Sequence, residues 1–267
     1  MFSRIALLLL AVTLTTQAIA AQHTPPRHDM CREATPTIRQ MWLSGAYDAP
    51  PAVAALMVDA IDGKLSGVRQ QLQDMPPADT WRWRQTAMLT AVWTGQTAVV
   101  DGLLDDGAAV NSTGWVPPLK PGFFGQTVDA MKHDPRFGGA TALKGLMAAG
   151  VVGNQGELTG PALMAATQCG DVATLDVLLR HHVNIAQRRT PNAPDALTVA
   201  TVDGDAVVVQ FLLDHGADPC ADDRRTNSFH HKHATRAAHT LAQMGAHSML
   251  PAKLVARLTC PVVASIR

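Results

Sequence analysis

The sequence is poor in charge, in aromatic residues and in cysteine, and each shortage argues against a class of protein. Only 16% of the 267 residues are charged, and 22 basic residues balance 22 acidic residues. Binding to nucleic acid or to an acidic membrane requires a basic surface, so this neutral composition argues against both partners. Aromatic residues make up 4% of the chain, with a single tyrosine. The four cysteines form no Cys-x-x-Cys pair, which disfavours a redox or zinc motif.

The sequence also lacks the short motifs of common catalytic and nucleotide-binding sites. It contains no Gly-x-Ser-x-Gly, no His-Glu-x-x-His and no glycine-rich loop followed by Lys-Ser or Lys-Thr. Glutamate is scarce, and most aspartates fall at predicted turns, where local hydrogen bonding accounts for them. We therefore expect a protein that is not an enzyme and that uses no cofactor.

Long hydrophobic runs are missing except at the N-terminus. A basic residue precedes an apolar run over residues 5–14, and Ala18-Ile19-Ala20 follows as a small-x-small cleavage site. This order is typical of a secretory signal peptide, here residues 1–20, and the run is too short to span a ~30 Å hydrocarbon core. We expect cleavage near Ala21 and export to a bacterial periplasm. Secretion is the second choice, and a retained membrane anchor is the weaker alternative.

One spacing recurs through the rest of the chain. From Gln85 to Asn111, a Thr-Ala-x-Leu opening leads through small residues to Gly95, then to a Val-Val-x-x-Leu-Leu run and a Gly-Ala-x-Val-Asn exit. The pattern predicts a helix, a tight turn, a second helix and an exit loop. Glycine suits the turn because its backbone adopts positive φ at low cost. The glycines at this place of the pattern are Gly63, Gly95, Gly170, Gly204 and Gly245.

These features resemble the ankyrin repeat, whose period is about 33 residues and whose opening is Thr-Pro-Leu-His-x-Ala. The resemblance implies an all-α solenoid of stacked helix pairs with projecting loops, within a repeat domain of residues 51–262. We expect about six units, near residues 52–79, 84–116, 123–158, 159–190, 193–224 and 233–260. The third is interrupted by an irregular loop, and the sixth is a divergent cap.

Each predicted helix pair carries an apolar stripe that it cannot bury alone, so neighbouring units must bury it. The predicted stack residues are Leu89, Val99, Val100, Leu103 and Leu104 in the second unit and Val207, Val208, Phe211 and Leu212 in the fifth. Small residues allow close approach of the helices, among them Ala165, Ala166 and Ala200. Residues 21–50 are predicted to form an irregular arm and a capping helix from Thr35 to Leu43, since threonine is a good N-cap.

The cysteines can pair if the protein reaches an oxidising compartment. If the sixth unit stacks on the fifth, Cys220 and Cys260 become neighbours, and we predict a disulfide bond that fixes the C-terminal cap. The alternative is two free buried thiols. A bond between Cys31 and Cys169 requires the N-terminal arm to run across three units, and the sequence leaves that pairing open.

A histidine-rich tract, His230-His231-Lys232-His233, is the best candidate for a metal site, because imidazole binds zinc, copper and nickel. The lysine places a positive charge among the imidazoles and no carboxylate is close in sequence. We therefore favour a solvated loop and assign no metal site. His181, His182 and His215 fall in the last turn of second helices, where a cation suits the helix dipole, and His182 occupies the usual place of glycine.

The tryptophans are concentrated between the first and third units. In the register of the repeat, Trp81 and Trp83 lie on the loop before unit two, Trp93 lies beside the turn glycine, and Trp115 lies on the following loop. The resemblance implies that such projecting positions contact protein partners, so we predict a protein-binding surface of Trp81, Trp83, Trp93 and Trp115. The phenylalanines Phe123, Phe124 and Phe137 are predicted to pack the loop of unit three instead.

Together these features lead to a periplasmic protein that binds another protein, although the step from fold to function is an analogy. The favoured hypothesis is an immunity protein or inhibitor that neutralises a secreted antibacterial effector, because a rigid concave surface suits an inhibitor. One alternative is an accessory protein that supports a periplasmic enzyme such as catalase. The other is a metal-handling protein that uses the histidine tract. The sequence leaves the partner and the oligomeric state open.

Overall fold

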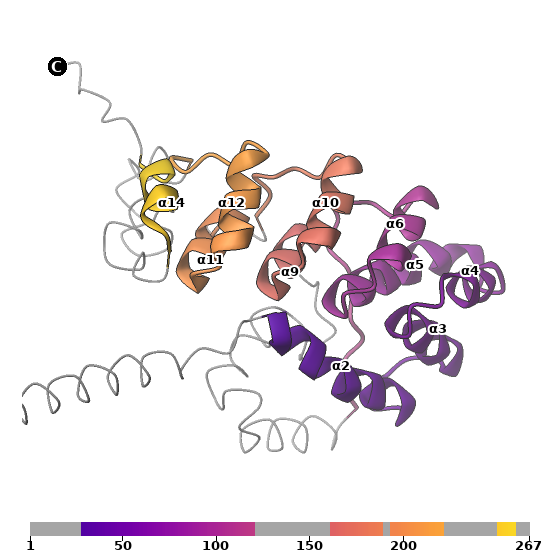
Figure 1. Cartoon of the computed structure of the whole chain (residues 1–267). Helices are drawn as coiled ribbons and strands as arrows, with labels where there is room; N and C mark the ends of the chain where they lie inside the picture. The colour runs from indigo at the N-terminus through magenta and orange to yellow at the C-terminus, as the bar shows by residue number, and fades with distance from the viewer. Residues whose placement is uncertain (1–27, 121–160, 189–192, 222–249, 260–267) are drawn as a thin grey trace, which may run out of the picture.

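The computed structural model describes residues 28–120, 161–188, 193–221 and 250–259, and within them the chain forms short helices joined by tight turns. Helices in this part form pairs that stack side by side (Figure 1). The pairs are α3 (Pro51–Ile61) with α4 (Leu65–Gln73), α5 (Pro77–Trp93) with α6 (Thr97–Asp105), α9 (Ala162–Cys169) with α10 (Val172–Arg180), and α11 (Ala196–Asp203) with α12 (Ala206–Asp214). This arrangement confirms the predicted all-α solenoid of the ankyrin-repeat type.

Each pair turns on the glycine that the sequence pattern selects. After Gly95, for example, the Gln96 N–H donates to the Ala91 carbonyl oxygen at 2.8 Å. This hydrogen bond belongs to a glycine C-cap, which ends the first helix and redirects the chain into the second. Gly245 lies outside the described residues. The turn glycines with φ between 65° and 75°, in the left-handed region, are Gly63, Gly95, Gly170 and Gly204.

In the two later pairs an aspartate follows the turn glycine and caps the second helix. The Asp171 carboxylate accepts from the Thr174 N–H at 3.1 Å, and the Asp205 carboxylate accepts from the Val208 N–H at 3.0 Å. Such a cap stabilises a helix by about 1 kcal/mol. Gln96 occupies this place in unit two and makes no side-chain cap, so α6 depends more on its packing.

The pairs bury a continuous apolar core that largely follows the predicted stripes. Val208 and Leu212 are fully buried, but Val207 is 59% exposed, so its assignment to the stack is wrong. Consecutive helical residues are separated by about 100°, so three valines in a row cannot all face the core, and here Val208 and Val209 do. The other predicted residues that are buried are Leu89, Val99, Val100, Leu103, Leu104, Ala165, Ala166 and Ala200.

The stack passes directly from unit two to unit four. Helix α5 contacts α9, and α6 contacts α10. Across this junction the hydroxyl oxygens of Thr97 and Thr174 lie 3.0 Å apart, and Asn111 Oδ1 accepts the Asn184 backbone N–H at 2.7 Å. The face of unit two that a third unit would cover is therefore already buried. The prediction that a unit of residues 123–158 stands between them in the stack is wrong, and residues 121–160 lie outside the described part.

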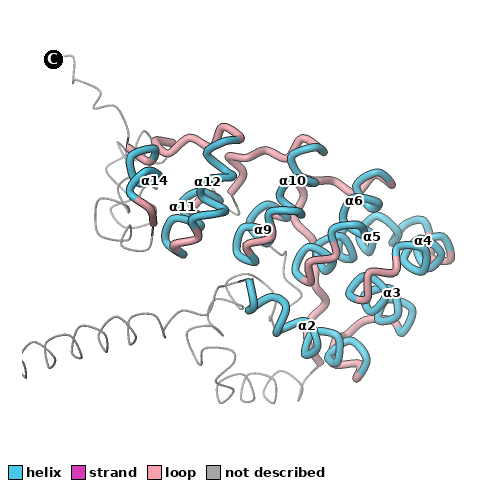
Figure 2. Tube along the Cα trace, viewed as in Figure 1, coloured by secondary structure: helices cyan, strands magenta, loops and turns pink. Residues whose placement is uncertain are grey.

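Helix α2 (His28–Leu43) is longer than the sequence predicts. It begins at His28 rather than Thr35 and includes Pro36 in its interior. It contacts α3 and α9, on the side of the stack formed by the first helices of the pairs (Figure 2). Tertiary packing offsets the cost of an interior proline, which the sequence pattern treats as a helix start. The side chains of α2 that are buried or packed against the core are Ala34, Ile38, Met41 and Trp42.

Helix α14 (Ala252–Arg257) packs on α12 at the other end of the stack. Leu254 and Leu258 are buried there, and Arg257 donates to Asp214 at 2.7 Å. This agrees with the predicted second helix of the terminal cap; the first part of that unit lies outside the described residues. None of the helices described is long and apolar enough to cross a membrane.

Candidate protein-binding surface

Two of the predicted interface tryptophans lie on a helix rather than on a loop. Helix α5 begins at Pro77 and has Asp79 in its first turn. Proline is tolerated at the first helical position and an acidic side chain suits a helix N-terminus, so α5 starts about two turns before the repeat motif. The expectation that Trp81 and Trp83 occupy a loop is therefore wrong.

Trp83 and Trp115 form an edge-to-face pair at the start of unit two. Their ring centroids are 5.5 Å apart and their planes are inclined by 63°. Trp83 is 7% exposed, so it anchors the loop of Trp115 on α5, and the expectation that it projects is wrong. The guanidinium carbon of Arg82 lies 5.3 Å from the centroid of Trp115, in the range of a cation–π contact.

Two buried polar side chains hold the loop that carries Trp115 in place by hydrogen bonds. Gln85 is 1% exposed and exchanges two hydrogen bonds with the backbone of Ala109, each 3.0 Å long. The Thr86 hydroxyl donates to the Trp115 carbonyl oxygen at 2.7 Å. Sequence reasoning used Gln85 only to mark the start of the repeat. The sequence did hold a signal: Gln85 and Thr86 directly precede core residues. Polar side chains buried there require hydrogen-bond partners.

Trp81 is the exposed member of this group. Its side chain is 57% exposed, and the neighbouring Arg82 is exposed as well. We call Trp81, Arg82, Trp83 and Trp115 the aromatic tip. Tryptophan and arginine are enriched among the residues that dominate binding free energy at interfaces. Because Trp83 and Trp115 are already packed together, the start of α5 that carries Trp81 is held in place before a partner binds.

Trp93 lies at the opposite end of α5 and does not project. It lines a cavity of about 30 Å³ together with Ile38 and Trp42 of α2. Its Nε1 is buried and has no hydrogen-bond partner among the described residues. The expectation that Trp93 projects beside the turn glycine is wrong, because α2 covers this part of α5.

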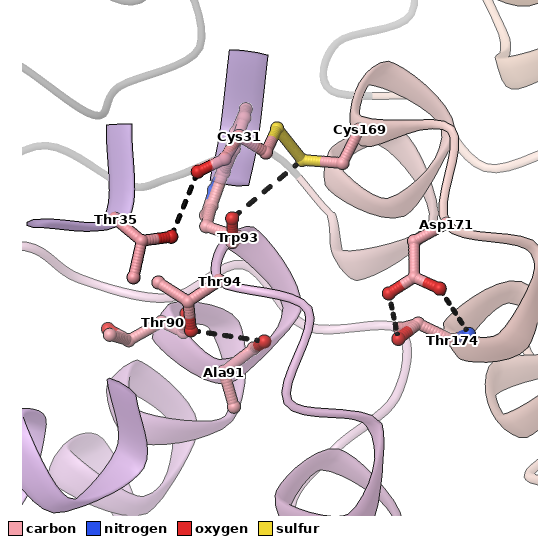
Figure 3. The surroundings of a disulfide bond; sticks show 9 residues. All are labelled: Cys31, Thr35, Thr90, Ala91, Trp93, Thr94, Cys169, Asp171 and Thr174. Atoms are coloured by element: carbon pink, nitrogen blue, oxygen red, sulfur yellow. Dashed lines mark hydrogen bonds between the residues drawn. A yellow bond between two sulfur atoms is a disulfide. The ribbon is translucent and has the colours of Figure 1, made fainter. Parts of the chain in front are cut away.

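A disulfide bond joins Cys31 in α2 to Cys169, the last residue of α9 (Figure 3). The two Cα atoms are 5.5 Å apart. Because unit four packs directly on unit two, α2 reaches α9 without crossing a further unit. Cys169 Sγ also lies 3.9 Å from the Trp93 carbonyl oxygen, so the bond lies close to the end of α5 as well. The pairing that the sequence left open is therefore formed.

Cys220 is disulfide-bonded as well. It lies in the exit loop after α12, where its backbone N–H donates to the Asp218 carboxylate at 2.9 Å. Cys260, the partner that the sequence predicts, lies outside the described residues. The Cys220–Cys260 bond therefore stays a prediction.

A charged seam crosses the junction of α6 and α10. His181 Nε2 lies 2.9 Å from Asp101 Oδ1, and the Arg180 guanidinium lies 3.4 Å from the other Asp101 oxygen. Hydrogen bonds from His181 and then from Arg180 lower the pKa of Asp101 below its usual value. The Asp105 carboxylate is 3.8 Å from the same imidazole nitrogen. The seam links unit two to unit four through ion pairs.

The residue types in this seam also suit a metal ion. Asp101, Asp105 and His181 bring three ligand atoms within 4.8 Å of one another. Arg180 already offsets the charge of Asp101, and surface carboxylates of this kind are common in ion-pair networks, so we assign the group a structural role. The histidine tract at residues 230–233 lies outside the described part.

The histidines predicted at the ends of second helices are found there. His181 and His215 are the C-cap residues of α10 and α12. The next residue in unit four, His182, has φ of 60° and occupies the place that Gly107 and Gly216 occupy in units two and five. A histidine therefore holds a left-handed position where the other two units have glycine.

No protein-family model and no curated protein matches this chain. Among solved structures, the chain is similar to the ankyrin repeat domain of Bcl-3, described as a unique member of the IkappaB protein family. The two are 20% identical, the match covers 78% of this chain and 86% of that chain, and the TM-score is 0.38. The ankyrin-type architecture of this chain is seen in its own helix pairs, turn glycines and stacking.

Proposed function

We propose that this protein is a binding protein that contacts a protein partner through the aromatic tip. The observation that carries the proposal is Trp81, whose side chain is 57% exposed near the start of α5, the helix on which Trp83 and Trp115 are already packed together. An exposed indole gains free energy when a partner removes it from water. Arg82 beside it supplies hydrogen-bond donors for a carboxylate or carbonyl group of the partner.

We further propose that the protein acts in a bacterial periplasm. Residues 1–20 have the pattern of a secretory signal peptide, and the Cys31–Cys169 bond belongs to a class that persists in oxidising compartments. Fractionation of cells that express the full chain tests this location. We expect a periplasmic product whose mass corresponds to a start near Ala21. An uncleaved product confined to the cytoplasm contradicts the proposal.

The role that we propose is inhibition of a secreted antibacterial effector. The helix stack is fixed by a disulfide bond and by ion pairs between its units, so the surface is rigid. A rigid surface loses little conformational entropy on association, which favours the tight and lasting complex that an inhibitor needs. The same surface on an accessory protein would bind its enzyme without blocking it.

A capture experiment with matched variants tests the binding surface. Mature wild-type protein, Trp81→Ala and Val207→Ala are used as bait for periplasmic and secreted proteins. Val207 is 59% exposed on α12, two units away in the stack, so it controls for loss of any exposed apolar side chain. We expect Trp81→Ala to recover at least about tenfold less partner, the loss typical of one interface anchor, and Val207→Ala to recover a normal amount. Equal recovery by Trp81→Ala refutes the aromatic tip.

The activity of the captured partner distinguishes inhibitor from accessory protein. The isolated partner is assayed alone and with an equimolar amount of wild-type protein. Loss of its activity, together with protection of cells that express it, supports inhibition. Unchanged or increased activity overturns inhibition and favours the accessory role.

A further inference from the structure

Pro36 divides α2 into two parts that are supported differently. Proline has no backbone N–H to bond the preceding turn, and its ring disfavours helical backbone at the residue before it, here Thr35. The helix therefore has an intrinsic weak point between Thr35 and Pro36. Whether each part stays in place depends on its own contacts with the stack.

The part after Pro36 is held by packing and by an ion pair. Trp42 is 3% exposed and stacks on Tyr47, with ring centroids 4.1 Å apart. Arg39 donates two hydrogen bonds to the Asp62 carboxylate, at 2.7 and 3.0 Å. Several independent contacts therefore fix residues 37–43 on the stack.

Among the side chains described before Pro36, the disulfide bond is the main attachment to the stack. Among its described side chains, Ala34 is buried, and alanine buries little apolar area, while Arg32 is exposed. The Thr35 hydroxyl donates to the Cys31 carbonyl oxygen at 2.9 Å, which supports the helix itself but not its attachment (Figure 3). The bond from Cys31 to Cys169 is thus the principal attachment that these side chains provide.

The disulfide bond also lies next to the end of α5, since Cys169 Sγ is 3.9 Å from the Trp93 carbonyl oxygen. The Trp93 side chain itself lines a cavity with Ile38 and Trp42, which belong to the part of α2 after Pro36. Release of residues 28–35 therefore leaves the covering of the Trp93 indole in place.

From these contacts we propose that residues 28–35 form a strap that the Cys31–Cys169 disulfide holds over the ends of α5 and α9, and that reduction releases at Pro36. The reductant is a dithiol. One of its thiolates attacks Cys31, the more exposed of the pair, and the sulfur–sulfur bond breaks with Cys169 leaving as a thiolate that takes a proton. The second thiol of the reductant then releases Cys31 as a thiol, and the reductant leaves as its own disulfide.

Release of the strap changes which surface the protein offers. In the oxidised protein the end of α9 is covered, and Cys169 is 5% exposed. In the reduced protein this end becomes open, in addition to the aromatic tip at the start of α5. This device does not depend on the identity of any partner, and it can be tested on the isolated protein.

Hydrogen exchange measured by mass spectrometry tests the strap. The variant Cys220→Ser with Cys260→Ser keeps Cys31 and Cys169 as its pair, and it is compared oxidised and after reduction with dithiothreitol. We expect amides of residues 32–35, whose helical acceptors are the carbonyl groups of residues 28–31, to exchange at least about tenfold faster after reduction. Those of residues 40–43 should change less than about threefold. Unchanged protection of residues 32–35, with both thiols shown to be free, overturns the proposal. Release of all of α2 overturns the hinge.

Pro36→Ala is the matched variant for the hinge. It restores a backbone donor within α2 and leaves the disulfide bond in place. After reduction, this variant should keep the protection of residues 32–35 within about threefold of its oxidised value, because the continuous helix stays anchored through residues 37–43. Release equal to that of the proline-containing protein contradicts a hinge at Pro36. If the double serine variant does not fold, wild-type protein is measured with its free thiols assigned by peptide mass.

Discussion

Cys31 and Cys169 are 138 residues apart in the sequence, yet a disulfide bond holds their Cα atoms 5.5 Å apart. The bond ties the helix that precedes the repeats to the first helix of unit four. It depends on the direct packing of unit two on unit four, which brings α9 within reach of α2. The N-terminal helix and the first three described pairs are thereby linked into one body.

Removal of this bond should lower the free energy of unfolding substantially. A bond that closes so long a loop restricts the unfolded chain, and we expect Cys31→Ser with Cys169→Ser to cost about 2–5 kcal/mol. Guanidinium unfolding of the double variant and the oxidised wild type measures the difference. A loss of unfolding free energy below about 0.5 kcal/mol would show that the unfolded chain gains little conformational freedom when the disulfide bond is removed.

The ion pair between Arg39 and Asp62 should make the attachment of α2 sensitive to acid. Hydrogen bonds from Arg39 lower the pKa of Asp62 from 3.8 to about 2. Because the pKa is lower in the folded state, the stabilisation is present above pH 3.8 and is lost as the pH falls towards 2. Arg39 is 40% exposed, so solvent screening weakens this contribution.

Asp62→Asn tests this dependence, with the exposed Asp48→Asn as control. Urea unfolding is measured at several values of pH. The Asp62 variant should be less stable than wild type at neutral pH, and this difference in the free energy of unfolding should disappear as the pH approaches 2. A difference that stays constant over the whole range would contradict the assignment.

His182 should be replaceable by glycine with a gain in stability. Its φ of 60° lies in the left-handed region, where the other exit turns have Gly107 and Gly216. Left-handed backbone costs a residue with a side chain roughly 1–2 kcal/mol, and the added freedom of glycine in the unfolded chain returns part of this. We expect His182→Gly to raise the free energy of unfolding by about 0.5–1 kcal/mol. His182→Ala is the control and should give no gain; a less stable glycine variant would refute the strain.

The buried pair of Arg188 and Asp195 should be sensitive to truncation. Their side chains are 8% and 10% exposed, and the charged atoms lie 3.0 Å apart. Asp195 also caps α11 by accepting from the Thr198 N–H at 2.8 Å. Asp195→Ala removes the cap and leaves a buried guanidinium without its carboxylate, for a cost of about 3–5 kcal/mol.

Asp205→Ala separates the two effects in Asp195→Ala. Asp205 caps α12 in a similar way but lies in a more open position. Its replacement should cost about 1 kcal/mol. Equal losses in the two variants, measured by thermal unfolding, would show that the buried charge pair contributes nothing beyond the cap.

The helix pairs could be predicted because their determinants are local. A glycine at position 95 and leucines at 103 and 104 specify a turn and a buried face within one repeat. The extent of α2 could not be predicted, because Thr35 and Pro36 form a helix-start pattern that long-range packing overrides. The Cys31–Cys169 bond could not be predicted from the sequence either, since it depends on which units are neighbours in the stack.

The sequence predicted that tryptophans form the candidate site, but it did not predict which of them are exposed to solvent. Trp81 and Trp83 are two residues apart, which on a helix separates their directions by about 200° and leaves one in water and one in the core. On the predicted loop no such alternation applies. Trp93 is partly covered by α2, and the repeat pattern does not encode that coverage.

Site-specific photo-crosslinking tests the aromatic tip most directly. A photoreactive phenylalanine analogue replaces Trp81 in one variant and Val207 in another, and both are irradiated in cells that contain the partner. Because a crosslink forms only at atoms in contact, the account predicts a discrete adduct from position 81 and none from position 207. Adducts of equal yield at both positions, or an adduct at position 207 alone, would contradict the proposal that the aromatic tip binds the partner.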